Sequence, residues 1–324
     1  MKIYNIAFLL LFLYHFAFPI TDSQKRPDIN INKPAAVNLA FKSTDGGQTW
    51  QDISQGLPEN WEGDDFFANE GGLYVSAGNR LYHSKPNSTI PFWENEIFPD
   101  DHRSIAAGMS GIFAFNWNGH FLQKLNGTNV WSPVFTNFQA GEIRNVFETA
   151  GGTLFICTNY RLYKSTNGGK TWKEVFTGGW VIKMVESNGV LLATSQNGIL
   201  RSDNDGENWK CVLSEGGVGI DIEPIKGGFA AINYNTQLMA RTVRATYDGG
   251  KSWQSIDAGL PPHLNTASII QVGDNFFCGH PAGIFKSSDN GKTWKLLLPS
   301  IGDKVFNLFV SGNVIYAIPR SGGC

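Results

Sequence analysis

Carboxylates, arginines and aromatic side chains recur in the polar segments between the short apolar runs of this 324-residue chain. The predicted connections between successive repeat units hold Trp61, Asp64, Asp65, His102, Arg103, Glu142, Arg144, Trp180, Asp221, Glu223, His263 and Lys304. The predicted loops between the second and third strands of a unit hold Trp117, Tyr160, Arg161, Tyr234, His280 and Arg320, and the longest insertion, roughly Asn233 to Arg244, also lies in one of them. Aromatic rings stack on sugars and peptides, while carboxylates and guanidinium groups bond their polar atoms. We interpret the set as a candidate binding surface; any one member alone can instead cap a strand or pack between elements.

Known catalytic motifs do not accompany these residues. The sequence has no G-x-S-x-G, H-E-x-x-H, nucleotide-binding glycine loop or D-x-D-x-D-G calcium loop. Its four cysteines, Cys157, Cys211, Cys278 and Cys324, show no C-x-x-C spacing. We therefore expect neither a metal nor another cofactor. Cys157 and Cys278 lie in apolar runs and should be buried thiols, with a disulfide as the open alternative.

Composition indicates a globular chain with many turns. Aromatic residues make up 13%, charged residues 17%, and there are 37 glycines. The formal net charge is -2, without a long basic or acidic run. This balance gives no electrostatic reason to expect a nucleic-acid partner.

The N-terminus predicts a secretory signal peptide over residues 1–23. Lys2 precedes a nearly continuous apolar stretch from Ile6 to Phe18, which is short for a membrane span. An uncleaved anchor is the alternative. We expect a linker over 24–36 and a protein that is secreted or periplasmic, without a membrane span in the mature chain.

An eight-residue pattern recurs along the chain. Clear copies, such as Ser-Thr-Asp-Gly-Gly-Gln-Thr-Trp at 43–50, lie at 43–50, 165–172, 246–253 and 287–294, and a looser one at 202–209. Trp93 and Trp131 keep the phase, although the turn before each has lost the pattern. The seven tryptophans are 37 to 44 residues apart. A period near 40 with short strands is typical of propeller blades.

Each repeat predicts four short strands. In one unit these are 181–187, 189–195, 198–202 and 209–213, separated by Gly, Asn and Asp turns. The recurring pattern forms the turn between the third and fourth strands, where Asp or Asn bonds backbone N–H groups and Gly adopts positive φ. We therefore assign structural roles to Asp45, Trp50, Asn167, Trp172, Asn204, Trp209, Asp248, Trp253, Asp289 and Trp294.

The S-x-D-x-G-x-T-W pattern resembles the Asp-box (BNR) repeat of sialidases, sortilin-type receptors, some glucanases and photosystem II assembly factors. The resemblance implies an all-β fold, a seven-bladed propeller of four-stranded antiparallel blades. Two strands within 302–319 have no Asp box after them, and two within 37–53 have no strands before them. We expect these to join as the closing blade, giving a propeller domain over 37–320 and a tail over 321–324.

The resemblance to sialidases implies three arginines that hold a carboxylate, with an acid Asp and a Tyr–Glu pair. Arg103, Arg144 and Arg320 are the candidates, but the family's Arg-Ile-Pro signature is absent. Glucanases of this type resemble paired propellers, and sortilin-type receptors carry further domains. Photosystem II assembly factors are similar in size. We predict a monomeric, non-catalytic binding module for a protein or glycan partner; the alternative is a glycoside hydrolase of sialidase type.

Overall fold

The computed structural model describes residues 38–59, 61, 65–77, 79–97, 104–116, 118–136 and 143–321. Contacts divide the chain into two units, Met1–Pro34 and Ala35–Cys324, and every described residue belongs to the second. The predicted signal peptide and nearly all of the predicted linker lie outside the described residues.

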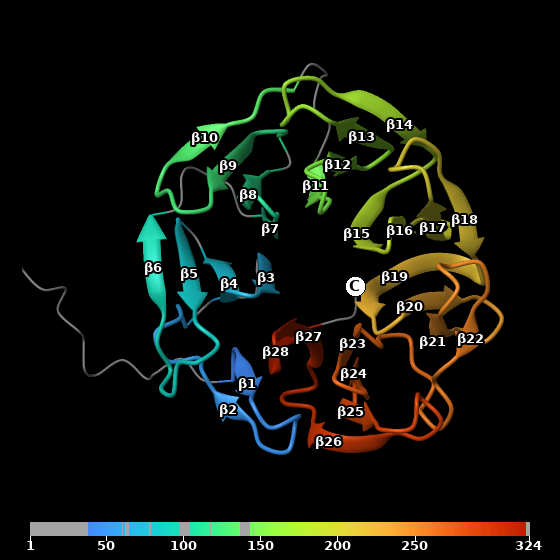
Figure 1. The fold of residues 1–324 in the computed structure, drawn as a ribbon. Coiled ribbons are helices and arrows are strands. Elements are labelled where there is room, and N and C mark those ends of the chain that lie inside the picture. The colour runs from blue at the N-terminus through green and yellow to red at the C-terminus, as the bar shows by residue number, and fades with distance from the viewer. Residues whose placement is uncertain are drawn as a thin grey trace, which may run out of the picture. The chain divides into compact units, whose positions relative to one another are not determined.

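Seven four-stranded antiparallel sheets follow one another around a ring in the second unit (Figure 1). We number the blades I (β3–β6), II (β7–β10), III (β11–β14), IV (β15–β18), V (β19–β22), VI (β23–β26) and VII (β27, β28, β1, β2). The predicted seven-bladed β-propeller is confirmed.

The strands of each blade run from the centre of the ring outward. The first strands are β3 (Asp65–Asn69), β7 (Ser104–Ala107), β11 (Ile143–Glu148), β15 (Val181–Ser187), β19 (Gly216–Ile225), β23 (Ser268–Val272) and β27 (Val305–Ser311). The second strands are β4 (Gly72–Ala77), β8 (Gly111–Phe115), β12 (Leu154–Thr158), β16 (Val190–Ser195), β20 (Gly228–Asn235), β24 (Asn275–His280) and β28 (Val314–Arg320).

The third and fourth strands form the outer hairpins. The third strands are β5 (Arg80–Ser84), β9 (Phe121–Leu125), β13 (Arg161–Ser165), β17 (Gly198–Ser202), β21 (Ala240–Thr246), β25 (Gly283–Ser287) and β1 (Phe41–Ser43). The fourth strands are β6 (Glu94–Ile97), β10 (Trp131–Pro133), β14 (Lys173–Thr177), β18 (Lys210–Leu213), β22 (Gln254–Ser255), β26 (Lys295–Pro299) and β2 (Gln51–Asp52).

This strand order gives the ring two distinct faces. The turns between first and second strands and between third and fourth strands lie on one face, which we call the Asp-box face. The turns between second and third strands, and the connections from one blade to the next, lie on the other, which we call the channel face. A rigid scaffold that carries loops on one face is a common arrangement for binding sites.

Blade VII closes the ring as predicted. β1 pairs with β28, with Phe41 opposite Ala317 and Ser43 opposite Ile315. Both ends of the described chain therefore share one sheet, and β28 has a partner on each side. Pairing removes the free edge that an unclosed sheet would expose.

Apolar side chains fill the junctions between blades. Each of the seven core clusters combines side chains of two adjacent blades, as where Phe113 of blade II meets Ile156 of blade III. Phe41 and Phe306 pack edge to face at 6.2 Å at the junction of blades VI and VII. Since each blade is buried on both faces, its second strand reads as a continuous apolar run, as the fully buried β12 does.

The Asp boxes form the turns between third and fourth strands, as predicted. Asp45 accepts the backbone N–H of Thr49 at 3.0 Å and its hydroxyl at 2.6 Å, and Ser43 accepts the N–H of Gly47 at 2.8 Å. The bonds from the side chain and then the backbone of Thr49 lower the pKa of Asp45 to about 2. Asn167 replaces the carboxylate in blade III and still accepts the N–H of Thr171 at 3.0 Å.

The tryptophan of the pattern keeps its place even where the turn has changed. Trp294 donates its indole N–H to the carbonyl of Ile256 in the preceding blade at 2.9 Å. Trp93, whose turn has lost the Asp box, donates to the corresponding carbonyl of Ile53 at 2.7 Å. Trp131 lies in β10 under the ammonium of Lys124, 5.6 Å from the ring centre.

In several blades, a cationic side chain near the end of the third strand bonds the outer turn of the following blade. These junction cations are Lys42 (to the carbonyls of Pro86 and Ser88), Lys164 (to Asp205 and Glu207, both at 2.8 Å), Arg201 (to the carbonyl of Gly249 at 2.6 Å) and Lys286 (to the carbonyl of Gly46 at 3.3 Å). Each reaches the turn of the following blade, so they fix the angle between adjacent sheets.

Other predictions concern the cysteines and the membrane. Cys157 and Cys278 are buried and, like the exposed Cys211, unpaired; Cys324 lies outside the described residues. Within the part of the chain that the structure describes, there is no helix long and apolar enough to cross a membrane.

Candidate functional site

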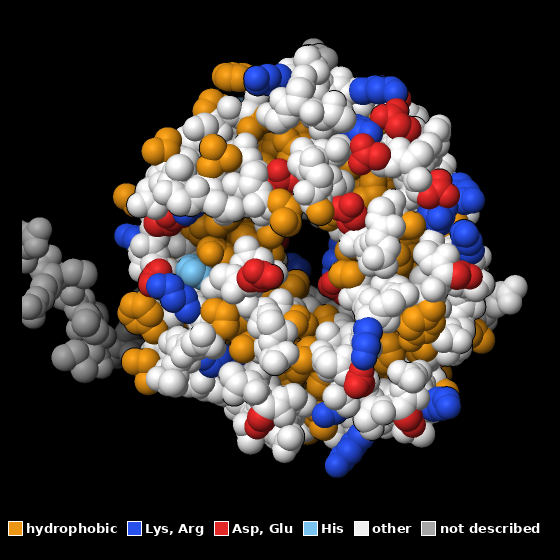
Figure 2. Space-filling view, in the orientation of Figure 1, with side chains coloured by type: hydrophobic (Ala, Val, Ile, Leu, Met, Phe, Trp, Pro, Cys, Tyr) orange, Lys and Arg blue, Asp and Glu red, His pale blue; other side chains and the backbone are white. Residues whose placement is uncertain are grey.

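The first strands surround a central channel that contains a cavity of about 760 Å³. Figure 2 shows the ring hollowed at its centre, with charged side chains of both signs scattered around the hollow. The volume is within the range of about 300–1,000 Å³ that is common for small-ligand sites. Five of the predicted site residues line this cavity: Asp65, Arg144, Asp221, Glu223 and Arg320.

Each first strand contributes one polar side chain to a ring around the channel. Each member immediately precedes a residue that packs into a junction core; the members are Asp65, Ser104, Asn145, Lys183, Asp221, Ser268 and Asn307.

Members of this ring bond across to the next blade. Asp65 accepts the N–H of Ile105 at 2.9 Å, and Asp221 accepts that of Ile269 at 3.0 Å. Asn145 donates to the carbonyl of Ile182 at 2.6 Å. Because these acceptors and donors belong to the neighbouring blade's backbone, the ring holds the inner strands in register with one another.

Asp65 lies beside the guanidinium of Arg320. Burial raises the pKa of Asp65 to about 7, although the N–H groups of Ile105 and Phe66 and the charge of Arg320 act in the opposite direction. Arg320 lies over the ring of Phe66, 5.4 Å from its centre, in a cation–π arrangement. The site therefore contains a carboxyl group that titrates near neutral pH.

Lys183 forms a second charged group in the channel. Its ammonium contacts Asp221 at 2.7 Å and also the carboxylate of Glu223. Burial lowers the pKa of Lys183, but the two carboxylates outweigh this effect and the net shift is upward. Burial raises the pKa of Glu223, against the charge of Lys183. The triad is thus a positive charge held between two acidic groups, already satisfied within the protein.

Two further arginines line the cavity and bond within their own surroundings. Arg144 donates through Nε to the side chain of Asn159, and Arg241 donates to the carbonyl of Thr266 at 3.0 Å. Arg144 and Arg320 therefore line one cavity, as the sialidase hypothesis requires, while each has its own partners. Arg103, the third predicted arginine, lies outside the described residues.

Four other predicted residues lie on the channel face around the cavity. Tyr160 is 73% exposed at the turn between β12 and β13, and the neighbouring Arg161 pairs with Glu174 at 2.5 Å. Trp180 is partly exposed in the connection between blades III and IV. Tyr234, in β20, donates its hydroxyl to the sulfur of Met239 at 3.4 Å.

Trp61 and His280 are buried. Trp61 packs edge to face on Phe66 at 6.3 Å. His280 bonds the carbonyl of Pro261 through Nε2 at 2.9 Å and accepts the N–H of Ala282 at Nδ1 at 3.0 Å. Burial lowers the pKa of His280, so the neutral ring serves as a link between two loops.

The other predicted residues Asp64, His102, Trp117 and Glu142 lie outside the described residues. Sequence reasoning missed Lys183, Arg241 and Asn145. The signal that could have found Lys183 and Asn145 is their register: each is polar at the strand position that Asp65 and Asp221 occupy. Arg241 gives no such signal, because its approach to the channel depends on the long β20–β21 hairpin.

Several apolar side chains on the channel face of blades III to VI are exposed. They are Tyr160, Ile182, Leu238, Met239 and Leu264, each at least 40% exposed. The tip of the β20–β21 hairpin is tied to the next connection, because Arg241 donates its N–H to the carbonyl of His263 at 3.0 Å. This bond holds the hairpin that carries Leu238 and Met239 against the connection that carries Leu264. Exposed apolar groups on rigid loops are typical of surfaces that contact a partner.

Metal binding has no support in the described ranges, where no group of three or more His, Cys, Asp or Glu side chains is placed to hold an ion.

Comparison with known proteins identifies the repeat. The BNR/Asp-box repeat family matches residues 41–52, which include the first copy of the pattern. The sequence matches no curated protein in the comparison.

Solved structures with the same fold have diverse roles. A GH74 xyloglucanase from Xanthomonas campestris has a TM-score of 0.64 at 14% identity, with 85% of this chain and 53% of that chain covered. The extracellular domain of a one-component system from B. thetaiotaomicron has a TM-score of 0.61 at 12% identity, covering 78% of this chain and 38% of that chain. YCF48 bound to D1 peptide has a TM-score of 0.52 at 16% identity, covering 79% and 92%. At such identities the likeness establishes the fold alone.

Proposed function

We propose that this Asp-box β-propeller is a secreted or periplasmic, monomeric binding module that takes up a segment of a partner protein across its channel face. The observation that carries the proposal is the group of exposed apolar side chains on the braced loops of blades III to VI, beside a cavity of about 760 Å³. A partner's apolar side chain would cover Leu238, Met239 and Leu264, and its backbone would pass over the channel mouth.

The charged groups of the channel already have partners within the protein. Lys183 is held between Asp221 and Glu223, and Asp65 accepts the N–H of the next blade. These charged groups hold the ring together, and their bonds leave the exposed loops as the surface available to a partner. YCF48, which shares the fold, is solved with a bound peptide, which is consistent with peptide recognition on such a scaffold.

Selection of displayed random peptides on the purified protein tests this function. Selected peptides should bind the unchanged protein, and replacing Leu238 and Met239 together with Ser should weaken them at least tenfold, about 1.4 kcal/mol. The matched control is Met109→Ser, an equally exposed methionine on the Asp-box face.

The same protein should be incubated with a fluorogenic sialoside. Peptide binding that is insensitive to Leu238 and Met239 would contradict the proposal. Turnover of the sialoside that is lost in Arg144→Ala or Arg320→Ala would replace it with the sialidase-type alternative.

A further inference from the structure

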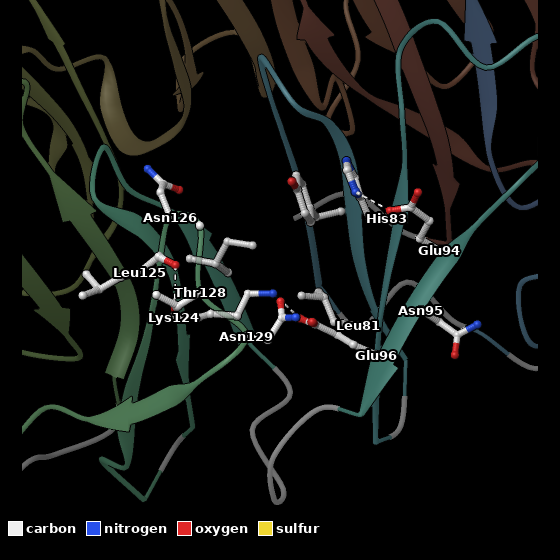
Figure 3. A pocket seen from close by; sticks show the side chains of 13 residues that line it. Leu81, His83, Glu94, Asn95, Glu96, Lys124, Leu125, Asn126, Thr128 and Asn129 are labelled. Carbon is white, nitrogen blue, oxygen red and sulfur yellow. Dashed lines mark hydrogen bonds and ion pairs between the residues drawn. The ribbon is translucent and has the colours of Figure 1, made fainter.

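A second cavity, of about 570 Å³, opens between blades I and II, away from the channel (Figure 3). We call it the blade I–II cleft. Its lining comes from blade I (Tyr74, Leu81, His83, Glu94, Asn95 and Glu96) and from blade II (Ile112, Lys124 and the turn 125–129). Figure 3 shows His83 and Glu94 at one end and the Lys124–Glu96 pair at the other.

The cleft exists because the outer turn of blade II is short. Five residues, 126–130, join β9 to β10, whereas seven, 166–172, join β13 to β14. In blade IV the turn presses so closely on the preceding blade that a Cβ on Gly206 would lie 2.4 Å from the ring of Phe155. Tyr74 has the position of Phe155 in blade I, but a Cβ on Gly127 of the short turn would meet nothing within 4 Å.

The junction cation is also replaced here. His83 has the strand position of Lys164 and Lys286, next to the residue that precedes the turn. Instead of reaching blade II, it stacks on Tyr74 at 4.1 Å with an interplanar angle of 4° and bonds the carbonyl of Gly71 at 2.8 Å. Tyr74 in turn stacks on Phe67 at 4.9 Å. Tyr74 covers one face of His83, and the imidazole, whose side chain is 19% exposed, still lines the cleft.

The charges around the cleft are paired. Glu94 contacts Lys85 at 2.6 Å, and Glu96 contacts Lys124 at 2.5 Å. Burial lowers the pKa of His83, an effect that the Gly71 carbonyl and Glu94 only partly offset, so its ring is neutral at pH 7. The blade II turn adds uncharged polar side chains, including Asn129. The lining is therefore rich in hydrogen-bonding groups and close to electrically neutral.

We propose that the blade I–II cleft is a binding site for a neutral saccharide of one or two rings. A sugar ring would pack its C–H face on His83, while its hydroxyls bond Glu94, Glu96 and the amides of the 125–129 turn. Carboxylates accept strong hydrogen bonds from hydroxyls, and an aromatic face selects a flat apolar one. A charged ligand would instead have to separate one of the existing ion pairs. This site is independent of the protein-binding function proposed for the channel face.

Calorimetric titration of the purified protein with maltose, cellobiose, lactose and N,N′-diacetylchitobiose tests the proposal. At least one should bind with a Kd below about 1 mM. His83→Ala should weaken that sugar at least tenfold, since it removes the stacking face. Asn129→Trp should abolish binding, because it fills the cleft from an exposed turn without altering the core. Lys170→Trp, a similarly exposed position in the turn of blade III, is the matched control and should bind as the unchanged protein does.

Three results would overturn the proposal. One is the absence of heat with every sugar at about 10 mM, tenfold above the weakest affinity expected. Another is binding that Asn129→Trp leaves intact, which would put the sugar elsewhere. A third is tighter binding of spermidine or glucuronate than of any neutral sugar, which would show that the cleft selects charge. None of these results bears on the Leu238 and Met239 experiment, so the two proposals can fail separately.

Discussion

Asp65 combines a structural bond with an unfavourable charge. Its carboxylate joins blade I to blade II through the N–H of Ile105, yet burial raises its pKa to about 7. The nearby Arg320 reduces this penalty without removing it. A neutral residue with the same bond would hold the two strands together without the unfavourable free energy of a buried charge. The carboxyl group should therefore make the protein's stability depend on pH.

Asp65→Asn should make the protein's stability less dependent on pH. Because the folded pKa exceeds the ordinary value of 3.8, the folded state binds more protons than the unfolded state between about pH 4 and 7, and stability falls as pH rises through this window. The shift corresponds to at most about 4 kcal/mol at pH 8. Asn keeps an acceptor for Ile105, so denaturant unfolding should show the variant more stable than the original at pH 8 and similar at pH 4.

The control is Asp274→Asn, an exposed carboxylate whose ion pair with Lys226 lies on the surface. It should leave the slope of stability against pH unchanged. An unaltered slope in Asp65→Asn would contradict the role assigned to this group.

At the scale of elements, the Asp-box turn both reverses the chain and fills the junction with the preceding blade. The glycine three residues before the tryptophan has positive φ and also lies against the neighbouring sheet. In blade IV this residue is Gly206, which lies against Phe155. The first requirement is local and visible in the sequence. The second depends on packing and explains why a short turn leaves a cleft.

Gly206→Ala should destabilise the protein more than Gly168→Ala. Both glycines have positive φ, +77° and +68°, so both variants carry the strain of about 1–2 kcal/mol that a β-carbon brings there. Only at Gly206 would the new Cβ also collide with a ring, whereas at Gly168 it would meet nothing within 4 Å. Thermal denaturation should show that Gly206→Ala loses about 1–3 kcal/mol more of the free energy of unfolding than Gly168→Ala does. Equal losses would show that the turn's contact with blade III contributes nothing.

Much of the fold could be predicted from single residues at fixed spacing. Trp93 and Trp131 kept the repeat visible where the turn was lost, and the unpaired strand patterns at both ends predicted blade VII. The site was harder to predict. The sequence predicts Asp65 and Asp221 as channel-face residues and both line the cavity, but their bonds to the next blade's backbone depend on contacts some 40 residues distant. The same limit applies to the cleft, since nothing local to His83 shows that the turn opposite is too short to reach it.

For the whole molecule, closure depends on a few residues at the start of the described chain. β1 and β2 complete blade VII, and Phe41 packs on Phe306 of the same blade in the core that blade VII shares with blade VI. Lys42 then bonds the turn of blade I. Removing this segment would leave β28 unpaired along one edge and open two junctions at once.

A chain that begins at residue 55 should therefore lose the closed ring. We expect it to unfold at a lower temperature and to associate through the exposed edge of β28, as light scattering after gel filtration would show. A chain that begins at residue 38 retains both strands and is the matched control. A monomeric, equally stable chain from residue 55 would contradict the role assigned to blade VII.

The replacement of a junction cation by His83 also bears on how the ring moves. At four other junctions, a long side chain bonds one blade to the turn of the next; these are Lys42, Lys164, Arg201 and Lys286. Between blades I and II, the Lys124–Glu96 pair bridges the gap without support from the turn above it. Among the described residues, blades I and II therefore lack the bond from the third strand to the following turn that those four junctions have. A molecule bound in the cleft would contact both blades, so we expect its binding to reduce the motion of blade I relative to blade II.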